Sequence, residues 1–384
     1  MTHDFHAKTL KGLEGILANE LRNIGADEVV PVNRGVNFKG SVAMMYKANL
    51  YLRTALRILM PVSRFRATNE DMLYKNIQAV DWTRFMTYKN SFAVDAVTFS
   101  KIFRNNHYVE LRIKDAIVDQ FRKNTSLRPS IDIKNAEIRV NVHIQETQFT
   151  ISLDSSGESL HKRGYRKAMH PASLSEVLAA GLVFLSGWNA EKPLLNPMCG
   201  SGTIALEAAM IAANIFPGIT GRSYAFQHWQ DFDQALFQRV LEGMPESHHL
   251  SHPVIATDVD PQAVRITRNN ARSLGLEKQL IIERSDFLES REMVEPVMII
   301  MNPPYGERLE VDNIEKLYQN IGTILKHKYH GSSAWLFTAN MEAAKHIGLK
   351  SESKYSLFNA GLECRYLNYS LFRGERKKHL HGSV

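Results

Sequence analysis

The sequence predicts an α/β protein whose C-terminal half forms a mostly parallel sheet with helices on both faces. Two observations favour this fold class. In residues 172–384, short apolar runs alternate with helix-forming segments, as in successive βαβ units. In residues 1–157, basic helices are joined to strands with period-2 alternation, which is typical of α+β modules. We therefore expect small α+β modules followed by a larger α/β domain.

The N-terminal half is expected to divide at a seam near residue 65, giving modules at 1–65 and 66–157. A basic, glycine-punctuated linker at 158–171 would then lead into the domain at 172–384. The elements expected before the linker are a strand (4–10), a helix (12–25), a helix leading into a strand (48–65), a strand (91–100), a basic amphipathic helix (106–124) and two strands (136–154).

The elements of the C-terminal half follow from apolar runs and helix-end signals. Pro261 in a first turn and Gly275 at an end define one helix, and basic residues near Lys328 suit the end of another. The expected order is strand (192–197), helix (201–214), strand (253–260), helix (261–275), strands (278–286 and 294–304), helix (312–328), strand (332–340) and an antiparallel pair (353–361 and 364–374).

The composition is that of an ordinary globular protein, with 44% hydrophobic and 23% charged residues. Charges near the N-terminus argue against a signal peptide. The longest apolar stretch, Val177 to Leu185, is too short to span a bilayer. Cys199 and Cys364 have no neighbours at metal-ligand spacing. We expect a cytoplasmic protein that binds neither a membrane nor a metal.

The positive charge is concentrated in the N-terminal part. Residues 1–165 carry 24 Lys and Arg against 17 Asp and Glu, whereas residues 166–384 carry 23 of each. A basic module joined to a neutral one suggests that the first part binds a polyanion while the second performs another task. A solvated basic surface without a partner is the alternative interpretation.

Polar features follow successive predicted strands, at the sheet edge where ligands bind in open α/β folds. The first is "NPMCGSGT", residues 196–203, whose glycines allow a tight turn near a ligand, although a plain strand–helix turn is the alternative. After an insertion at 214–252, Asp258 could accept from ribose hydroxyls; its alternative role, helix capping, suits Asp260 better. Asp286 could accept from an adenine amino group, or be a loop carboxylate.

The corner "NPPY", Asn302 to Tyr305, ends the strand expected at 294–304. Its two prolines fix the backbone and remove two donors, so the corner is either a rigid turn or a holder for something flat and polar. The Asn302 side-chain oxygen and the Pro303 carbonyl could accept both hydrogens of an amine and draw its nitrogen towards sp³ geometry. Tyr305 offers a face on which a flipped base could stack.

In this order, the loop, both aspartates and the corner resemble the class I S-adenosylmethionine-dependent methyltransferases, and "NPPY" is similar to the motif of their amino-methylating branch. The resemblance implies a Rossmann-like, mostly parallel seven-stranded sheet, S-adenosylmethionine as cofactor, and a target amine held by Asn302, Pro303, Pro304 and Tyr305. The family often has Asp where this chain has Asn196. The implied cofactor residues are Asn196, Met198, Cys199, Gly200, Ser201, Gly202, Thr203, Asp258, Val259, Asp286, Phe287 and Asn302.

The N-terminal half carries a second resemblance. The stretch "DFHAKTLKGLEGILANEL", the basic helix and "LHKRGYRKA" resemble the THUMP-containing RNA methyltransferases, whose ferredoxin-like and THUMP modules dock structured RNA. With "NPMCGSGT" and "NPPYGERL", the chain is most similar to the bacterial 23S rRNA guanine-N2 methyltransferases, as the N-terminal half of their large fused form. The residues expected to reach RNA phosphates are Arg112, Arg122, Lys123, Arg128, Lys134, Lys162, Arg163, Arg166 and Lys167.

The resemblance implies methylation of guanine N2 in 23S rRNA, free or in a ribosome assembly intermediate, by a monomer or weak dimer. Guanine-N2 methylation of tRNA stays open as an alternative. Protein glutamine methylation is disfavoured because an RNA-docking module would serve no purpose there. A non-catalytic RNA-binding or ribosome-assembly factor is the alternative from another class.

Overall fold

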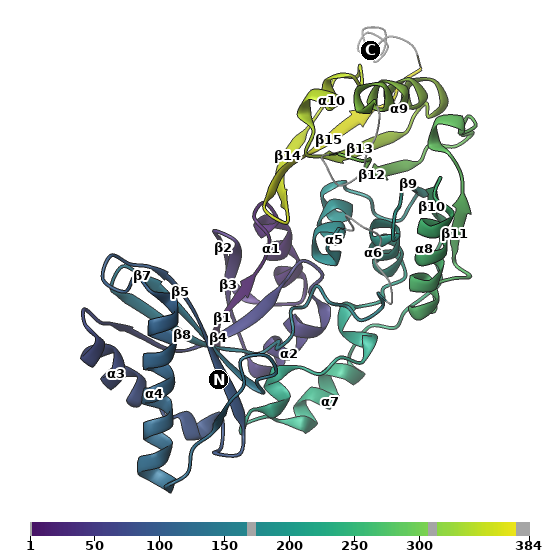
Figure 1. The fold of residues 1–384 in the computed structure, drawn as a ribbon. Coiled ribbons are helices and arrows are strands. Elements are labelled where there is room, and N and C mark those ends of the chain that lie inside the picture. The colour runs from purple at the N-terminus through teal and green to yellow at the C-terminus, as the bar shows by residue number, and fades with distance from the viewer. Residues whose placement is uncertain (1, 167–173, 306–312, 374–384) are drawn as a thin grey trace. The chain divides into compact units, whose positions relative to one another are not determined.

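The computed structural model describes residues 2–166, 174–305 and 313–373, and the chain divides into two compact units (Figure 1). The first comprises Met1–Thr9, Leu17–Lys162 and Gly221–Met244, and the second Leu10–Ile16, Arg163–Thr220 and Pro245–Val384. The units therefore interleave along the chain, whereas the sequence analysis assigned residues 10–16 and 221–244 by sequence order alone.

Packing explains both exchanges. Leu13 lies against Gly181 of the second unit so closely that a Cβ on the glycine would be 2.7 Å from a Leu13 methyl. In the first unit, the Tyr46 ring packs against Phe226 and Phe237, with centroids 4.6 and 5.4 Å apart. The insertion thus supplies aromatic core to the first unit.

Within the described residues, the first unit holds one sheet of strand order β2-β3-β1-β4-β8-β7-β5-β6. The long strand β4 pairs with β1 on one side and β8 on the other, so the seam expected near residue 65 falls inside a strand. The strands are β1 (His3–Lys8), β2 (Asp27–Val32), β3 (Gly35–Gly40), β4 (Arg57–Arg66), β5 (Ser91–Phe99), β6 (Ser130–Ile131), β7 (Ile138–Gln145) and β8 (Gln148–Asp154). The helices are α2 (Val42–Tyr51), α3 (Glu70–Gln78), α4 (Asn106–Thr125), α7 (Gln234–Glu242) and most of α1 (Glu14–Asn23).

The second unit has the predicted α/β architecture. In its described part the strand order is β11-β10-β9-β12-β13-β15-β14, parallel from β11 to β13 and antiparallel beyond. Figure 1 shows α5, α6 and α8 on one face, with α9 and α10 on the other. The elements are α5 (Glu176–Leu185), β9 (Leu194–Pro197), α6 (Thr203–Ala212), β10 (Val254–Asp258), α8 (Pro261–Ser273), β11 (Leu280–Arg284), β12 (Met298–Met301), α9 (Ile314–Lys328), β13 (Ser333–Thr338), α10 (Met341–Lys345), β14 (Lys354–Asn359) and β15 (Leu362–Ser370).

The position of the predicted site follows from the buried strand β12 and its parallel neighbours. All four residues of β12 are buried, and β12 is flanked by β9 and β13. Because β11, β10, β9 and β12 are parallel neighbours, the segments that follow them meet at one edge of the sheet. This is the edge that carries the glycine loop, both aspartates and the corner.

Candidate functional site

The glycine loop leaves β9 and enters α6 through left-handed backbone. Met198, Gly200 and Gly202 have φ values of 53°, 58° and 76°. At Gly202 a Cβ would lie 2.4 Å from Thr267 Cγ2, so both the backbone conformation and the space require glycine. Gly202 precedes α6 without a side-chain cap, which leaves N–H groups of the first helical turn for a ligand.

Asp258, at the end of β10, holds this loop. One carboxylate oxygen accepts from the Gly200 N–H at 2.9 Å and the other from the Asp260 N–H at 3.0 Å. Asp260 caps α8 by accepting from the Gln262 N–H, as its sequence position indicates. A carboxylate offers about four acceptor positions, so Asp258 has capacity for further donors.

The expected cofactor residues after β10 and β11 differ in how deeply their side chains are buried. Val259 is exposed, whereas the Phe287 ring is buried and stacks on Tyr329 at 5.6 Å. Asp286 accepts from the Leu288 N–H at 2.8 Å and so caps the turn that follows β11. The Phe287 side chain therefore contributes to the core, while Asp286 and Val259 lie at the sheet edge.

Helix α8 contributes two residues that the sequence analysis missed. Thr267 donates its hydroxyl to the Gly200 carbonyl at 3.0 Å, and Asn270 donates to the Ser201 carbonyl at 3.2 Å. Both side chains are fully buried. The sequence contained a pattern that could have identified them, because polar residues spaced i, i+3 on the apolar face of a helix need buried hydrogen-bond partners.

Cys199 lies within the same loop as a neutral thiol. Its sulfur is 3.7 Å from the Thr267 hydroxyl, and burial raises the pKa of the thiol to about 12. A nucleophilic cysteine would need a lowered pKa. The surroundings of Cys199 are therefore the opposite of those that activate a nucleophilic thiol.

The corner after β12 is fixed on several sides. The Tyr318 hydroxyl of α9 lies 3.3 Å from the Pro304 carbonyl and 2.7 Å from the Thr338 hydroxyl. The Tyr305 hydroxyl accepts from the Asn359 amide at 3.2 Å, and its ring meets Phe337 edge-on at 6.2 Å. Burial raises the pKa of Tyr305, which keeps its hydroxyl neutral.

Asn302 carries the most informative atom of the corner. Its side-chain oxygen is buried, and no described residue donates a hydrogen bond to it. Leaving a buried acceptor unpaired costs about 1–3 kcal/mol, and the side-chain oxygen of Asn196 on β9 is likewise buried without a donor among the described residues. The neighbouring Asn196 donates to the Ile300 carbonyl at 2.8 Å and so ties β9 to the strand that carries the corner.

Two of the expected phosphate contacts are corrected by the structure. The side chains of Arg163 and Arg166 are 0% and 12% exposed and pair with Glu207 and Glu176. They face the interior of the second unit because these buried carboxylates compensate their charge. Lys167 lies outside the described residues.

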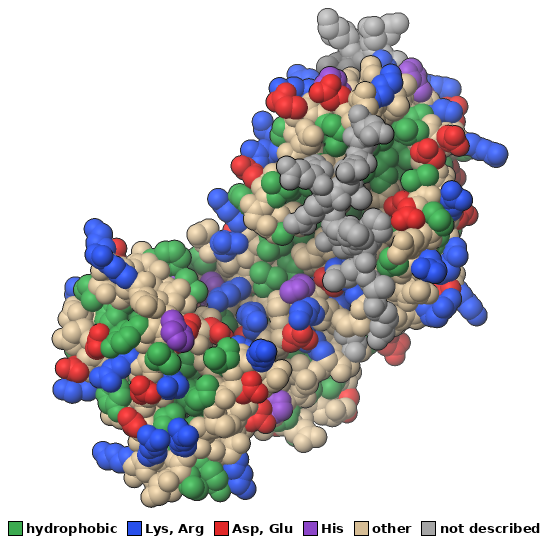
Figure 2. Space-filling model, viewed as in Figure 1, with side chains coloured by type: hydrophobic (Ala, Val, Ile, Leu, Met, Phe, Trp, Pro, Cys, Tyr) green, Lys and Arg blue, Asp and Glu red, His purple; other side chains and the backbone are tan. Residues whose placement is uncertain are grey.

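Of the other expected contacts, Arg112 pairs with Asp71 and lies over the Tyr74 ring, and Lys162 pairs with Glu158. The remaining four gather where α4 ends and β5 and β6 begin, since Ser91 pairs with Ser130 and the Ser126 N–H caps α4. Exposed basic and apolar side chains lie together at the lower end of this unit (Figure 2). This α4-end patch consists of Tyr88, Lys89, Arg122, Lys123, Leu127, Arg128, Ile131, Ile133 and Lys134.

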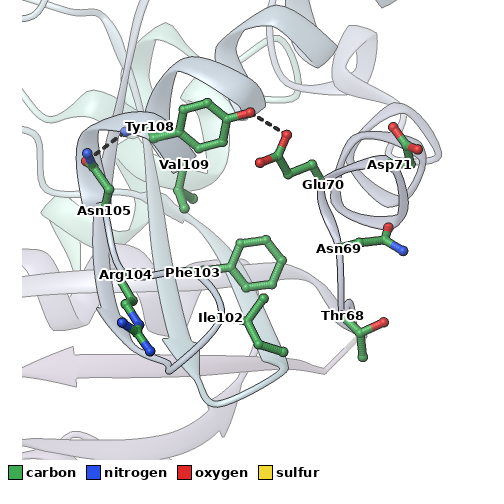
Figure 3. Close-up of a pocket in the computed structure, with 10 residues that line it drawn as sticks. All are labelled: Thr68, Asn69, Glu70, Asp71, Ile102, Phe103, Arg104, Asn105, Tyr108 and Val109. Carbon is green, nitrogen blue, oxygen red and sulfur yellow. Dashed lines mark hydrogen bonds between the residues drawn. The ribbon is translucent and has the colours of Figure 1, made fainter.

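A cleft of about 610 Å³ opens at the other end of α4 (Figure 3). Figure 3 shows Tyr108 reaching across it to a hydrogen bond with Glu70. Asp71 also lines the cleft, as do Ile102 and Phe103. The cleft is also lined by Arg104, so its side chains carry two carboxylates against one guanidinium, a charge balance that does not favour phosphate.

The described ranges also bear on metal binding and membrane insertion. Residues 2–166, 174–305 and 313–373 contain no group of three or more His, Cys, Asp or Glu side chains arranged to hold a metal ion. Over the same part of the chain, every helix is too short or too polar for a membrane span.

Comparison with known families matches three regions of the chain. Residues 4–59 match the RlmL ferredoxin-like domain, residues 67–154 the THUMP domain, and residues 163–368 the RMKL-like methyltransferase domain. The last match covers more than half of the chain.

Individual relatives agree with these matches. The chain is 40% identical to the ribosomal RNA large subunit methyltransferase K/L of Syntrophotalea carbinolica, over 96% of this chain and 53% of the relative. It is 35% identical to a Synechocystis protein described as an RNA methyltransferase, over 97% of each. The chain thus spans about half the length of the K/L relatives.

Solved structures show the same architecture. The crystal structure of SMU.472, described as a methyltransferase complexed with S-adenosylhomocysteine (SAH), matches with a TM-score of 0.87 at 30% identity. The match covers 97% of this chain and 99% of that one.

Proposed function

Because the chain belongs to the family of RMKL-like methyltransferase domains, we propose that it transfers the methyl group of S-adenosylmethionine to the exocyclic N2 of a guanine in 23S rRNA. The buried oxygen of Asn302, to which no residue in the described part of the chain donates a hydrogen bond, carries this proposal. This oxygen can accept a hydrogen bond from a substrate amine, and it lies at the same sheet edge as the glycine loop.

The loop and the strand ends fit S-adenosylmethionine. The loop from Asn196 to Thr203 would hold the methionine part against the N-terminus of α6. Asp258 would use its remaining acceptor capacity for the ribose hydroxyls, because its present bonds occupy one position on each oxygen. Asp286, with Val259 beside the same edge, would face the adenine.

At the corner, the chain's own groups do the positioning. When bound, S-adenosylmethionine supplies a methyl group on a positively charged sulfur. Asn302 Oδ1 and the Pro303 carbonyl accept the two hydrogens of the guanine amine, which draws its lone pair out of conjugation with the ring. The backbone at Pro304 is held in place, because its carbonyl accepts a hydrogen bond from the Tyr318 hydroxyl. After transfer the nitrogen gives up one proton to water, so the corner needs no strong base.

RNA docking is assigned to the first unit. Residues 1–165 carry the whole charge excess, and the α4-end patch combines exposed Lys and Arg with exposed apolar side chains. Such a surface favours phosphate contacts that depend on salt more than on sequence. Lys123, Arg128 and Lys134 are the residues that we expect to reach phosphates, with Arg122, Arg112 and Lys162 as weaker contributors because each has a carboxylate partner.

The choice of 23S rRNA rests on the K/L relatives, which are described as large-subunit ribosomal RNA methyltransferases. The test is transfer of labelled methyl from S-adenosylmethionine to total RNA of a strain lacking this gene, followed by size fractionation and nucleoside analysis. Label as N2-methylguanosine in 23S rRNA is expected. Label in tRNA would contradict the proposed substrate but support the proposed reaction. The absence of label in RNA and in ribosomal precursors would favour a non-catalytic RNA-binding factor.

A further inference from the structure

The segment Arg163 to Arg166, which the sequence suggested for RNA contact, instead lies along helix α6 inside the second unit. Arg163 Nε is 3.6 Å from Glu207 Oε1, and both side chains are fully buried. The Tyr165 hydroxyl donates to the same carboxylate at 3.2 Å. These contacts fix the segment on the second turn of α6, beyond the glycine loop.

Arg166 reaches the loop itself. Its Nη2 donates to Thr203 Oγ1 at 2.7 Å and also to the Leu174 carbonyl. Its Nε lies 3.5 Å from Glu176 Oε1, and the side chains of this pair are 12% and 4% exposed. Thr203 is the first residue of α6, and its hydroxyl is 3.2 Å from that of Ser201.

The presence of the Arg166 guanidinium near the N-terminus of α6 is not explained by a gain in folding stability. A cation beside a helix N-terminus opposes the helix dipole, and a buried ion pair contributes little net stability compared with an apolar pair. The rigid guanidinium, however, lets Nη2 donate to both Thr203 and Leu174 while Nε lies beside Glu176, an arrangement that the more flexible ammonium of lysine does not fix.

The loop is therefore braced from two sides. Thr267 and Asn270 of α8 hold the carbonyls of Gly200 and Ser201, and Arg166 holds the side chain of Thr203. We propose that Arg166 is a positioning residue for methyl transfer, which keeps the end of the glycine loop in the geometry that binds S-adenosylmethionine. This inference rests on the proposed function and assigns to the "HKRGYR" segment a role at the cofactor and not at RNA.

The test measures SAH affinity by calorimetry, KM for S-adenosylmethionine, kcat and the melting temperature in the full chain. Arg166→Lys keeps the charge beside Glu176 but loses the fork, and Thr203→Val removes the accepting hydroxyl without disturbing the ion pair. Each variant should weaken SAH binding by roughly tenfold, as expected for one charge-assisted hydrogen bond. The effect of the double variant should be smaller than the product of the two single effects, because both single variants remove the Arg166–Thr203 contact.

Arg163→Lys is the matched control, since it alters a buried Arg–Glu pair one turn further along α6. We expect it to lower the melting temperature but to leave SAH affinity and KM within about twofold. If the loss of SAH affinity in Arg163→Lys and Arg166→Lys is proportional to the fall in melting temperature of each variant, the role of Arg166 is only structural. Independent, additive effects of Arg166→Lys and Thr203→Val would also overturn the proposal.

Two further outcomes separate this inference from the proposed function. If the unaltered protein binds no SAH and methylates no RNA, the proposed function fails and the inference falls with it. If the unaltered protein is active and Arg166→Lys matches it in SAH affinity and KM, only the positioning role is wrong. Should Arg166→Lys not fold, Thr203→Val alone decides, because unchanged SAH affinity in that variant contradicts the brace.

Discussion

Gly202 and Thr267 show how single residues set the shape of the glycine loop. A side chain at Gly202 would have to adopt φ near 76° and would collide with Thr267 at 2.4 Å. Thr267 in turn donates to the Gly200 carbonyl from the buried face of α8. The close approach of loop and helix therefore depends on the absence of one side chain and the hydroxyl of another.

Thr267→Val should weaken SAH binding by about 3- to 10-fold, because the Gly200 carbonyl loses a buried donor worth about 0.5–1.5 kcal/mol. Calorimetry on the full chain measures this change. Thr323→Val is a matched control, since the Thr323 hydroxyl donates to the Gln319 carbonyl on the exposed face of α9. Equal effects of the two variants would contradict the role given to Thr267.

Cys199 gives a prediction about pH. Because burial raises the pKa of its thiol to about 12, the thiolate is scarce at pH 8 and increases only as the pH rises towards that value. Its thiolate fraction at pH 8 should be about a thousandfold below that of an unperturbed thiol. Iodoacetamide labelling followed by mass spectrometry should find Cys199 unmodified in the native protein and modified in urea. Rapid labelling of the native protein at pH 8 would show that the thiol is activated.

At the scale of elements, the corner depends on α9 as much as on its own prolines. Tyr318 is fully buried in the core beneath β12, and its hydroxyl joins the Pro304 carbonyl to Thr338. Burial raises the pKa of Tyr318 to about 12, so its hydroxyl stays a neutral hydrogen-bonding group at physiological pH. The helix therefore fixes the position of the residues that we propose to hold the amine.

Tyr318→Phe should lower kcat by about 10-fold while SAH affinity and KM for RNA stay near their original values, because only the fixation of the corner is lost. Steady-state kinetics with labelled S-adenosylmethionine checks this split. Tyr366→Phe is the control: it removes a buried hydroxyl whose bond goes to the Leu182 carbonyl of α5, so it should leave kcat unchanged. A rise in KM for RNA without a change in kcat would place Tyr318 in substrate binding instead.

The elements also show what the sequence could and could not predict. Strands β9 to β13 were predictable because each is an apolar run with a polar residue at or shortly after its carboxyl end. The hairpin of β2 and β3 was missed because the β2 residues are mostly exposed, so they show no apolar alternation. Arg163 and Arg166 were misassigned because a sequence shows their charge but not the buried Glu207 and Glu176 that compensate it.

For the whole molecule, the interleaving of the two units limits how they can be tested separately. A deletion of residues 1–165 would remove Leu13 from its contact with Gly181, and would leave Phe226 and Phe237 without Tyr46. No local signal in the sequence predicts such exchanges, because each depends on packing between distant segments. RNA docking is therefore better tested by charge removal in the intact chain.

Replacing Lys123, Arg128 and Lys134 by Gln should weaken RNA binding and reduce the slope of log K against log salt by about 0.7–0.9 for each phosphate that the variant no longer neutralises. Cofactor affinity should not change. The control replaces Lys75, Lys101 and Arg104 of the same unit by Gln, which removes equal charge away from the α4-end patch. If both triple variants lose the same affinity and slope, the patch is not a specific docking surface.

The most direct test of the proposed chemistry is single-turnover methyl transfer by Asn302→Ala, measured together with SAH binding. The buried Asn302 oxygen is proposed to act on the amine and not on the cofactor. We expect the rate of transfer to fall by at least about a hundredfold, as when one preorganised hydrogen-bonding group is lost from an active site, with SAH affinity within about threefold of the original. Retained transfer, or a loss explained by weaker SAH binding, would contradict the assignment of the corner as the amine holder.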